Sequence, residues 1–335
     1  EGVLMKRVVR AALPLVPVLT VLLAVLSMAP AAHAAHPAVM GARAMGMGGA
    51  FTAVVDDASA VYWNPAAIGL RPLSVDASIA SSGIAGLDAL QKLMEEDMAD
   101  LIEWEGGASA SVGLLVAGNV GFIGAGYIVS GDVAVESKES TIEGYAQVRS
   151  DIAVGAAMDV QRSGPVGIRF GAVVRSITVQ RAEVQDDKPP SGDPKAKERQ
   201  ASGYAVDAGV LIRATDMVTV GATARNLLGS LTWQGGAPAG QAAGVEFRAG
   251  VAVEPPFLGG VLAAEIASGG EIRYGVEKRF LFNGLALRAG QIHRDGKTLT
   301  TLGTGFALGP VAIDVAGITS DFKGFDVALE ASLRF

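Results

Sequence analysis

The residues of this sequence whose types and spacing could most readily take part in acid–base chemistry are the adjacent carboxylates Asp56 and Asp57. Neighbouring carboxylates can divide acid and base roles, but facing strands of a β-barrel bring many such pairs together by default. The three histidines, His33, His36 and His293, lack the spacing of metal ligands, and cysteine is absent. A Gly-x-Ser-x-Gly nucleophile motif is also absent. We therefore expect no enzyme, no cofactor and no metal.

A glycine-rich run from Gly46 to Phe51 invites comparison with phosphate-binding loops. A dinucleotide loop needs a glycine where Phe51 stands, and a nucleotide triphosphate loop ends in Lys followed by Ser or Thr. Neither condition is met, so we reject both interpretations.

The elements that must position these residues follow a period of two from residue 73 onward. In one segment Val245, Phe247, Ala249, Val251 and Val253 alternate with mostly polar residues. Such alternation puts the two sets on opposite faces of a strand. The pattern predicts 14 strands, with 12 or 16 as alternatives, at 73–81, 109–118, 120–130, 144–160, 166–180, 203–213, 218–227, 244–254, 260–267, 271–281, 285–293, 299–308, 311–319 and 325–335.

Two architectures fit this all-β pattern, a soluble sandwich or barrel and a transmembrane barrel. The lengths of the connections favour the second, because long segments at 82–108, 131–143, 181–202 and 228–243 alternate with short turns. Short periplasmic turns and longer outer loops are typical of outer-membrane barrels. We therefore predict a 14-stranded antiparallel transmembrane β-barrel, with its apolar face outward and its polar face inward.

The predicted polar faces carry arginines that would point into the lumen. They are candidate partners for Asp56 and Asp57, and the simpler alternative is that such pairs only hold a segment in place. These lumenal arginines are Arg169, Arg175, Arg213, Arg225, Arg248, Arg273, Arg279 and Arg288.

Composition excludes several classes of protein. Half of the 335 residues are hydrophobic, which excludes a disordered chain, and the net charge of −7 argues against nucleic-acid binding. Residues 1–34 combine a basic start, an apolar run and a small-x-small site ending at Ala34, and we predict a signal peptide there. An N-terminal membrane anchor is the alternative. At the other end, the apolar alternation that finishes in Phe335 matches the outer-membrane assembly signal.

The run from Met40 to Ala67 resembles the N-terminal segment of the FadL superfamily of outer-membrane barrels, most closely its PorV/PorQ-type short members. The resemblance implies a 14-stranded barrel over 73–335 with a plug, or hatch, formed by 35–72. A weaker resemblance to a strand end of this group lies at 224–229. The residues that carry the plug pattern are Gly41, Arg43, Gly46, Gly48, Gly49, Asp56, Asp57, Asn64, Pro65 and Ala66.

Two further segments have a distinct pattern. An apolar stripe with acidic flanks predicts a helix at about 87–104, either packed on the barrel rim or serving as a lid or landing site. The polar, proline-containing stretch 185–202 is typical of a solvated outer loop.

The resemblance implies uptake of small hydrophobic molecules across the outer membrane of a Gram-negative bacterium. Val173 and Leu211 are candidate apolar lumen positions. The alternatives are a PorV-like secretion partner that binds exported cargo proteins and a purely structural barrel. The expected partners are the lipid bilayer, the barrel-assembly machinery, and a hydrophobic ligand or a cargo protein.

Overall fold

A computed structural model describes residues 40–82, 108–137, 141–163, 166–187, 197–234, 244–294, 296–319 and 326–335. The predicted signal peptide at 1–34 and the predicted helix at 87–104 lie outside these residues. None of the helices in the described part is long and apolar enough to cross a membrane.

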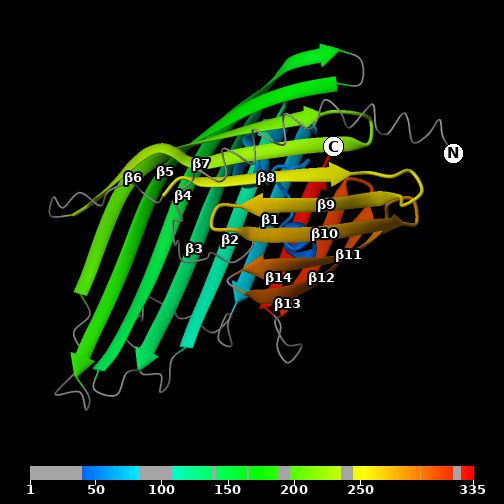
Figure 1. The fold of residues 1–335 in the computed structure, drawn as a ribbon. Helices are drawn as coiled ribbons and strands as arrows, with labels where there is room; N and C mark the ends of the chain where they lie inside the picture. The colour runs from blue at the N-terminus through cyan, green and yellow to red at the C-terminus, as the bar shows by residue number, and fades with distance from the viewer. Residues whose placement is uncertain are drawn as a thin grey trace.

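Fourteen strands in the described residues form one closed antiparallel barrel, as predicted (Figure 1). Each strand pairs with its neighbours in sequence, and β1 closes the barrel against β14, with Ile79 opposite Leu329. Closure leaves no sheet edge that must be covered, a condition for crossing lipid. The strands are β1 Leu73–Ser82, β2 Ala108–Val120, β3 Ile123–Ser137, β4 Thr141–Ser163, β5 Val166–Asp187, β6 Lys197–Arg213, β7 Val218–Trp233, β8 Glu246–Val253, β9 Gly260–Ala267, β10 Glu271–Phe280, β11 Leu285–Arg294, β12 Lys297–Leu308, β13 Val311–Thr319 and β14 Asp326–Arg334.

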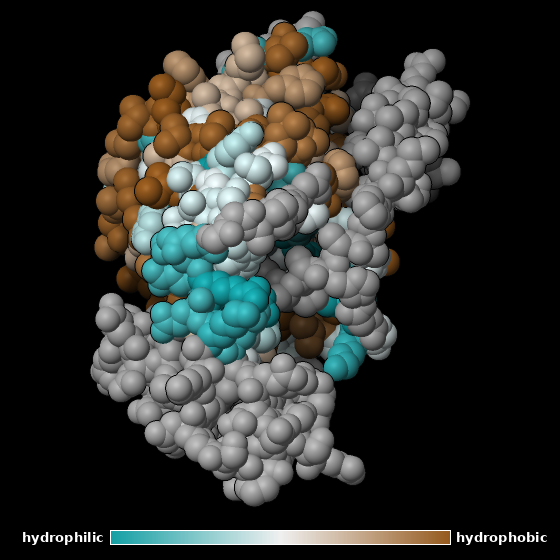
Figure 2. Space-filling view, turned by 90° about the vertical axis from the view of Figure 1, so that its left-hand side faces the viewer, coloured by the Kyte–Doolittle hydropathy of each residue, from teal (hydrophilic) through white to brown (hydrophobic). Residues whose placement is uncertain are grey.

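The two faces of the wall have the polarity of a transmembrane barrel. Outward residues such as Ile152, Val174 and Leu329 are at least half exposed, whereas inward Arg175 and Glu277 are buried. Figure 2 shows hydrophobic residues over much of one side of the barrel. Exposed apolar side chains around a charged interior are unfavourable in water and favourable in a bilayer.

Phenylalanines mark the end of the barrel that carries the short turns. Phe122, Phe257 and Phe282 lie in three of these turns, and each is exposed. Phe335 is also exposed, and its backbone N–H donates to the carbonyl of Leu73 at 2.9 Å. Aromatic residues gathered at one height of a barrel are typical of a membrane interface.

The prediction was wrong about several loops. Most of 131–143, much of 181–202 and the start of 228–243 are strand, so that β4 and β5 reach 23 and 22 residues. The turn between the strands predicted at 109–118 and 120–130 lies at 121–122. In Figure 1 the strands β3 to β6 extend well past the short strands β8 to β14. Hairpin pairing satisfies the backbone on both sides of the bilayer, so the ladder does not stop where the membrane ends.

Residues 40–72 lie inside the barrel, where Figure 1 shows them in blue. Their elements are short: α3 Ala42–Gly46, α4 Ala60–Trp63 and the 3-10 helix η1 Pro65–Ala67. The Asn64 side chain accepts from the N–H of Ala66 at 3.1 Å and so caps η1, with Pro65 at its first position. Nearly all residues from Met40 to Ile68 are buried.

Glycines in the wall allow this segment to contact the strands backbone to backbone. A Cβ atom at Gly171 would lie 2.2 Å from the carbonyl oxygen of Pro65, and one at Gly275 would lie 2.4 Å from that of Met47. The same holds at Gly290, whose Cβ would lie 2.4 Å from the backbone nitrogen of Gly48. The inner wall therefore has no space for a side chain at these positions, which lie on β5 and, across the barrel, on β10 and β11.

Substitution of Gly171 by Ala should displace the inner segment. The new methyl group meets backbone rather than a flexible side chain, so we expect a loss of about 1–3 kcal/mol. The readout is the temperature at which the purified barrel loses its heat-modifiable gel migration. Gly167→Ala, on the same face of β5, is the control, because its Cβ would have no neighbour closer than 3.9 Å. Equal stability of the two variants would contradict this packing.

Candidate functional site

Arg43 is the centre of the contacts between the inner segment and the barrel. Its Nε lies 3.1 Å from Glu277 on β10, and its Nη1 lies 2.5 Å from Asp56 and 3.5 Å from Asp57. Its backbone N–H donates to Glu330 of β14 at 3.0 Å. The guanidinium also lies 5.3 Å from the ring centre of Phe51. One buried side chain thus binds three carboxylates from two parts of the chain.

Ion pairing determines the ionisation of Arg43 and Asp56 in this inner segment. Burial alone would lower the pKa of Arg43, but Glu277, Asp56 and Asp57 hold it above its usual range. Burial alone would raise the pKa of Asp56, but Arg43 and Arg71 hold it well below its usual range. Both groups are therefore charged at neutral pH.

Four of the predicted lumenal arginines bind the inner segment through its carbonyls and aromatic rings. Arg169 donates to the carbonyls of Ala66 and Ile68 at 3.0 and 2.7 Å. Arg273 donates to the carbonyl of Gly49 at 3.1 Å. Arg225 stacks 4.3 Å from the Tyr62 ring centre, and Arg248 lies 5.3 Å from that of Trp63.

The expected pairing of Asp56 and Asp57 with the eight arginines is not what the structure shows. In the described residues, the ion pairs of Asp56 are with Arg43 and Arg71, and those of Asp57 are with Arg43 and Arg334. The reason is geometry: the segment folds back on itself, so its own Arg43 and Arg71 reach Asp56. Asp57 lies between Arg43 and Arg334 of β14, an arginine that was not among the eight.

The remaining predicted arginines have other roles. Arg175 pairs with Asp151 and, at 2.7 Å, with Asp207. Arg279 and Arg288 both pair with Glu277, at 2.6 and 2.7 Å. Arg213 is exposed and lines a cavity.

The glycines of the predicted plug pattern lie where the segment turns against the wall. Gly48 and Gly49 have φ of 64° and 69°, a region that favours glycine. A Cβ at Gly46 would lie 3.2 Å from the Arg288 side chain, and one at Gly41 would lie 3.1 Å from a Glu330 oxygen. The glycines thus allow tight turns of the backbone and close contact between the segment and side chains of the wall.

Sequence reasoning missed the acidic half of this site. Glu265 accepts hydrogen bonds from the N–H groups of Phe51 and Thr52 at 3.1 and 2.9 Å. Glu277 and Glu330 bind Arg43. The same alternation that placed the arginines inward also places these acids inward. The prediction considered only cationic partners for the two aspartates. The buried N–H groups of Phe51 and Thr52 and the side chain of Arg43 instead need anionic partners.

Two cavities lie near the short-turn end of the barrel. One of about 720 Å³ is lined by Arg43, Asp56, Arg169, Arg213 and Glu254, among others. The second, of about 430 Å³, is lined by Arg43, Arg71, Glu277, Arg279 and Arg334, among others. Their walls are rich in ionised groups, which suit water and ions rather than an apolar molecule.

An apolar patch lies on the inner face toward the opposite end. It comprises Ile177 and Val179 of β5, Ala201 and Ala205 of β6, and Leu231 and Trp233 of β7. Register brings these residues together, since Val179, Ala201 and Trp233 are consecutive cross-strand partners. Beside it lie Arg175, Asp207 and Asn226, which are linked by hydrogen bonds. The predicted lumen positions Val173 and Leu211 are buried.

Comparison with solved structures identifies the fold. The chain is similar to the toluene transporter TodX of Pseudomonas putida, with 15% identity and a TM-score of 0.54 over 88% of this chain and 98% of that one. It is also similar to the toluene transporter TbuX of Ralstonia pickettii, with 12% identity and a TM-score of 0.55 over 88% and 98%. The chain is likewise similar to a deltaS2S3 mutant of TodX, a monoaromatic hydrocarbon channel, with 14% identity and a TM-score of 0.56 over 88% of this chain and 99% of that one.

These likenesses establish a shared 14-stranded barrel fold over nearly the whole length of those channels. No family model matches the chain, and no curated protein sequence does. The comparison therefore rests on architecture, and the similar structures are transport channels rather than enzymes.

Replacing Arg43 by Ala should loosen the inner segment. The substitution leaves Glu277 buried with one fewer cation and removes the ion pairs that Arg43 makes with Asp56 and Asp57, at a cost of about 3–5 kcal/mol. We expect a lower midpoint of thermal unfolding and faster proteolysis within 40–72. Arg213→Ala, at an exposed arginine, should change neither. Unchanged stability of the Arg43 variant would contradict its central role.

The lowered pKa of Asp56 predicts how acid affects stability. Its contribution is present above the ordinary carboxyl pKa of about 3.9 and is lost as the pH falls through the lowered value. Asp56→Asn should therefore lower the unfolding temperature by the same amount from about pH 8 to 5, and by less below about pH 4. A difference that grows on acidification would contradict the assignment. Asp216→Asn, an exposed carboxylate of the same cavity, serves as control.

Proposed function

We propose that this protein is an outer-membrane channel for small hydrophobic molecules. The observation that carries the proposal is an apolar inner patch at one end of a barrel whose fold matches channels for toluene and other monoaromatic hydrocarbons. The resemblance of 40–67 to the FadL superfamily points the same way. In this proposal the patch of Ile177, Val179, Ala201 and Leu231 receives the molecule.

Charge along the lumen supports an exit through the wall. Past the patch, a molecule meets the Arg175–Asp207 pair, then the inner segment, then cavities lined by ionised groups. An apolar molecule has no favourable interactions with these ionised groups, whereas the lipid outside the wall is a favourable environment for it.

The wall beside the patch offers such an exit. Pairing between β7 and β8 covers only residues 218–225 of β7. Residues 228–233 pair with β6 alone among the described strands, and Asn226 and Leu227 lie at the break in the ladder. Asn226 has a φ of 53°, and the β6–β7 ladder shifts register between Val206 and Ala208. Leu231 and Trp233, which belong to the patch, lie on this incompletely paired stretch.

The inner segment then acts as the plug. Its contacts with Arg169, Arg273 and Glu265 hold it across the lumen, so that it blocks the path along the barrel axis. The protein would reside in the outer membrane of a Gram-negative bacterium, delivered there by a signal peptide and folded by the barrel-assembly machinery. None of the comparisons supports the alternative of a secretion partner, and that alternative is an outcome of the experiment below.

Uptake of radiolabelled toluene by intact Gram-negative cells tests the proposal. Cells that express the barrel should take up toluene faster than cells with an empty vector. Ala201→Trp should reduce the rate several-fold, because the indole fills the patch. Ser202→Trp is the matched control: it adds the same side chain to the adjacent residue of β6, which points outward and is exposed. Both variants are checked for heat-modifiable migration.

Equal uptake with and without the barrel would overturn the proposal. So would equal rates for Ala201→Trp and the unsubstituted protein. Co-purification of exported proteins with a barrel that does not raise uptake would favour the secretion partner.

A further inference from the structure

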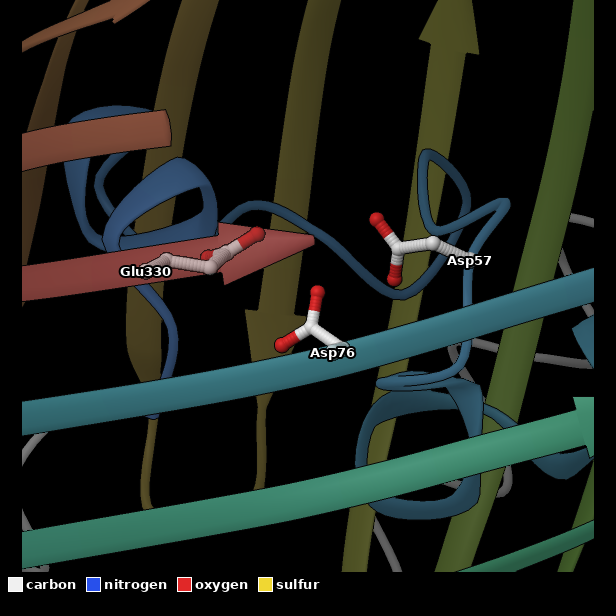
Figure 3. Close-up of side chains that lie close together, drawn as sticks. All are labelled: Asp57, Asp76 and Glu330. Carbon is white, nitrogen blue, oxygen red and sulfur yellow. The ribbon is translucent and has the colours of Figure 1, made fainter. Parts of the chain in front are cut away.

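Three carboxylates from three parts of the chain meet inside the barrel at its closing seam. Asp57 comes from the inner segment, Asp76 from β1 and Glu330 from β14, and each offers an oxygen within 4.8 Å of the other two. Figure 3 shows the three side chains pointing into the same space. All three are buried, with exposures of 2%, 0% and 5%.

Two of these carboxylates have partners. Asp57 accepts from Ser59 at 2.6 Å and lies 3.5 and 3.4 Å from Arg43 and Arg334. Glu330 accepts from the backbone N–H of Arg43 at 3.0 Å and from Arg334 at 3.1 Å.

Asp76 differs from both, because no N–H or O–H group among the described residues donates to either of its carboxylate oxygens. Glu330 is close enough to share a proton with it. An isolated buried carboxylate is strongly unfavourable, so Asp76 must be neutralised, either by a proton or by a bound cation.

The neighbouring cations are already shared. Arg334 lies within 3.6 Å of Asp57, Asp314 and Glu330, and Arg43 also serves Asp56 and Glu277. Neither pairs with Asp76 among the described ion pairs.

Two hydroxyls on the same strands add neutral oxygens beside the three carboxylates. Ser332 is the cross-strand partner of Asp76, and Ser78 is that of Glu330. Both are buried, and neither hydroxyl has a hydrogen-bond partner in the described part of the chain. Carboxylates combined with neutral oxygens are the ligands of hard cations. Calcium suits such a site better than magnesium, because it accepts irregular geometry, whereas magnesium retains several waters that a buried site has little space to hold.

We propose that Asp57, Asp76 and Glu330 bind a calcium ion that joins the inner segment to the β1–β14 seam. The ion neutralises Asp76 and ties the inner segment to the two strands that close the barrel. This proposal does not depend on hydrocarbon transport, since it concerns how the segment is held. It replaces the expectation from sequence that no metal is bound, which considered histidine ligands and not carboxylates from distant segments.

Calcium titration of the full-length, EDTA-treated barrel in detergent tests the site. Calorimetry should show one saturable site per chain, and calcium should raise the temperature at which heat-modifiable migration is lost. Asp76→Asn should weaken binding at least tenfold, while Glu254→Gln, a carboxylate outside the site, should leave it unchanged.

Absence of saturable binding up to about 10 mM calcium, beyond the range of weak extracellular sites, would overturn the proposal. Unchanged binding by Asp76→Asn would also overturn it. If Asp76→Asn instead raises stability equally with and without calcium, Asp76 and Glu330 share a proton and the calcium site is refuted. Titration of the unsubstituted protein decides the matter even if the variant does not assemble.

Discussion

The need to neutralise charge inside a closed wall governs this structure. The bilayer requires an apolar outer face, so the polar residues of each strand must point into the lumen. Buried charges are tolerated only when they are paired and hydrogen-bonded. The inner segment meets that need, because Arg43 binds Glu277 while its backbone N–H binds Glu330. The wall and the inner segment therefore neutralise each other's buried charges.

The wall is also asymmetric, and the asymmetry separates two environments. The long strands β5 to β7 carry the apolar patch, whereas the short-turn end carries cavities lined by arginine and carboxylate side chains. Between them lies the inner segment, which contacts the wall at glycines such as Gly171 and Gly275. An apolar patch and a polar base can thus occupy one barrel.

Much of this fold could be predicted from alternation alone. Period-two alternation marks most of the strands, and Arg169 and Arg273, which it predicts on the inner face, donate to carbonyls of the inner segment. Strand ends were less predictable: β4 and β5 continue past their predicted ends because the partner strand, and not local sequence, decides where pairing stops. Charge partners were least predictable, since any inward acid could meet any inward base.

The sequence by itself determined the faces of the strands, the turns of the inner segment at Gly48 and Gly49, and the cap of Asn64 on η1, because each depends on near neighbours. Only the tertiary structure decided which distant groups meet. Asp56 binds Arg43 and not the arginines of the wall, since the segment folds back within the lumen. Asp57, Asp76 and Glu330 converge because closure of β1 on β14 brings together residues more than 250 positions apart, a distance no local pattern encodes.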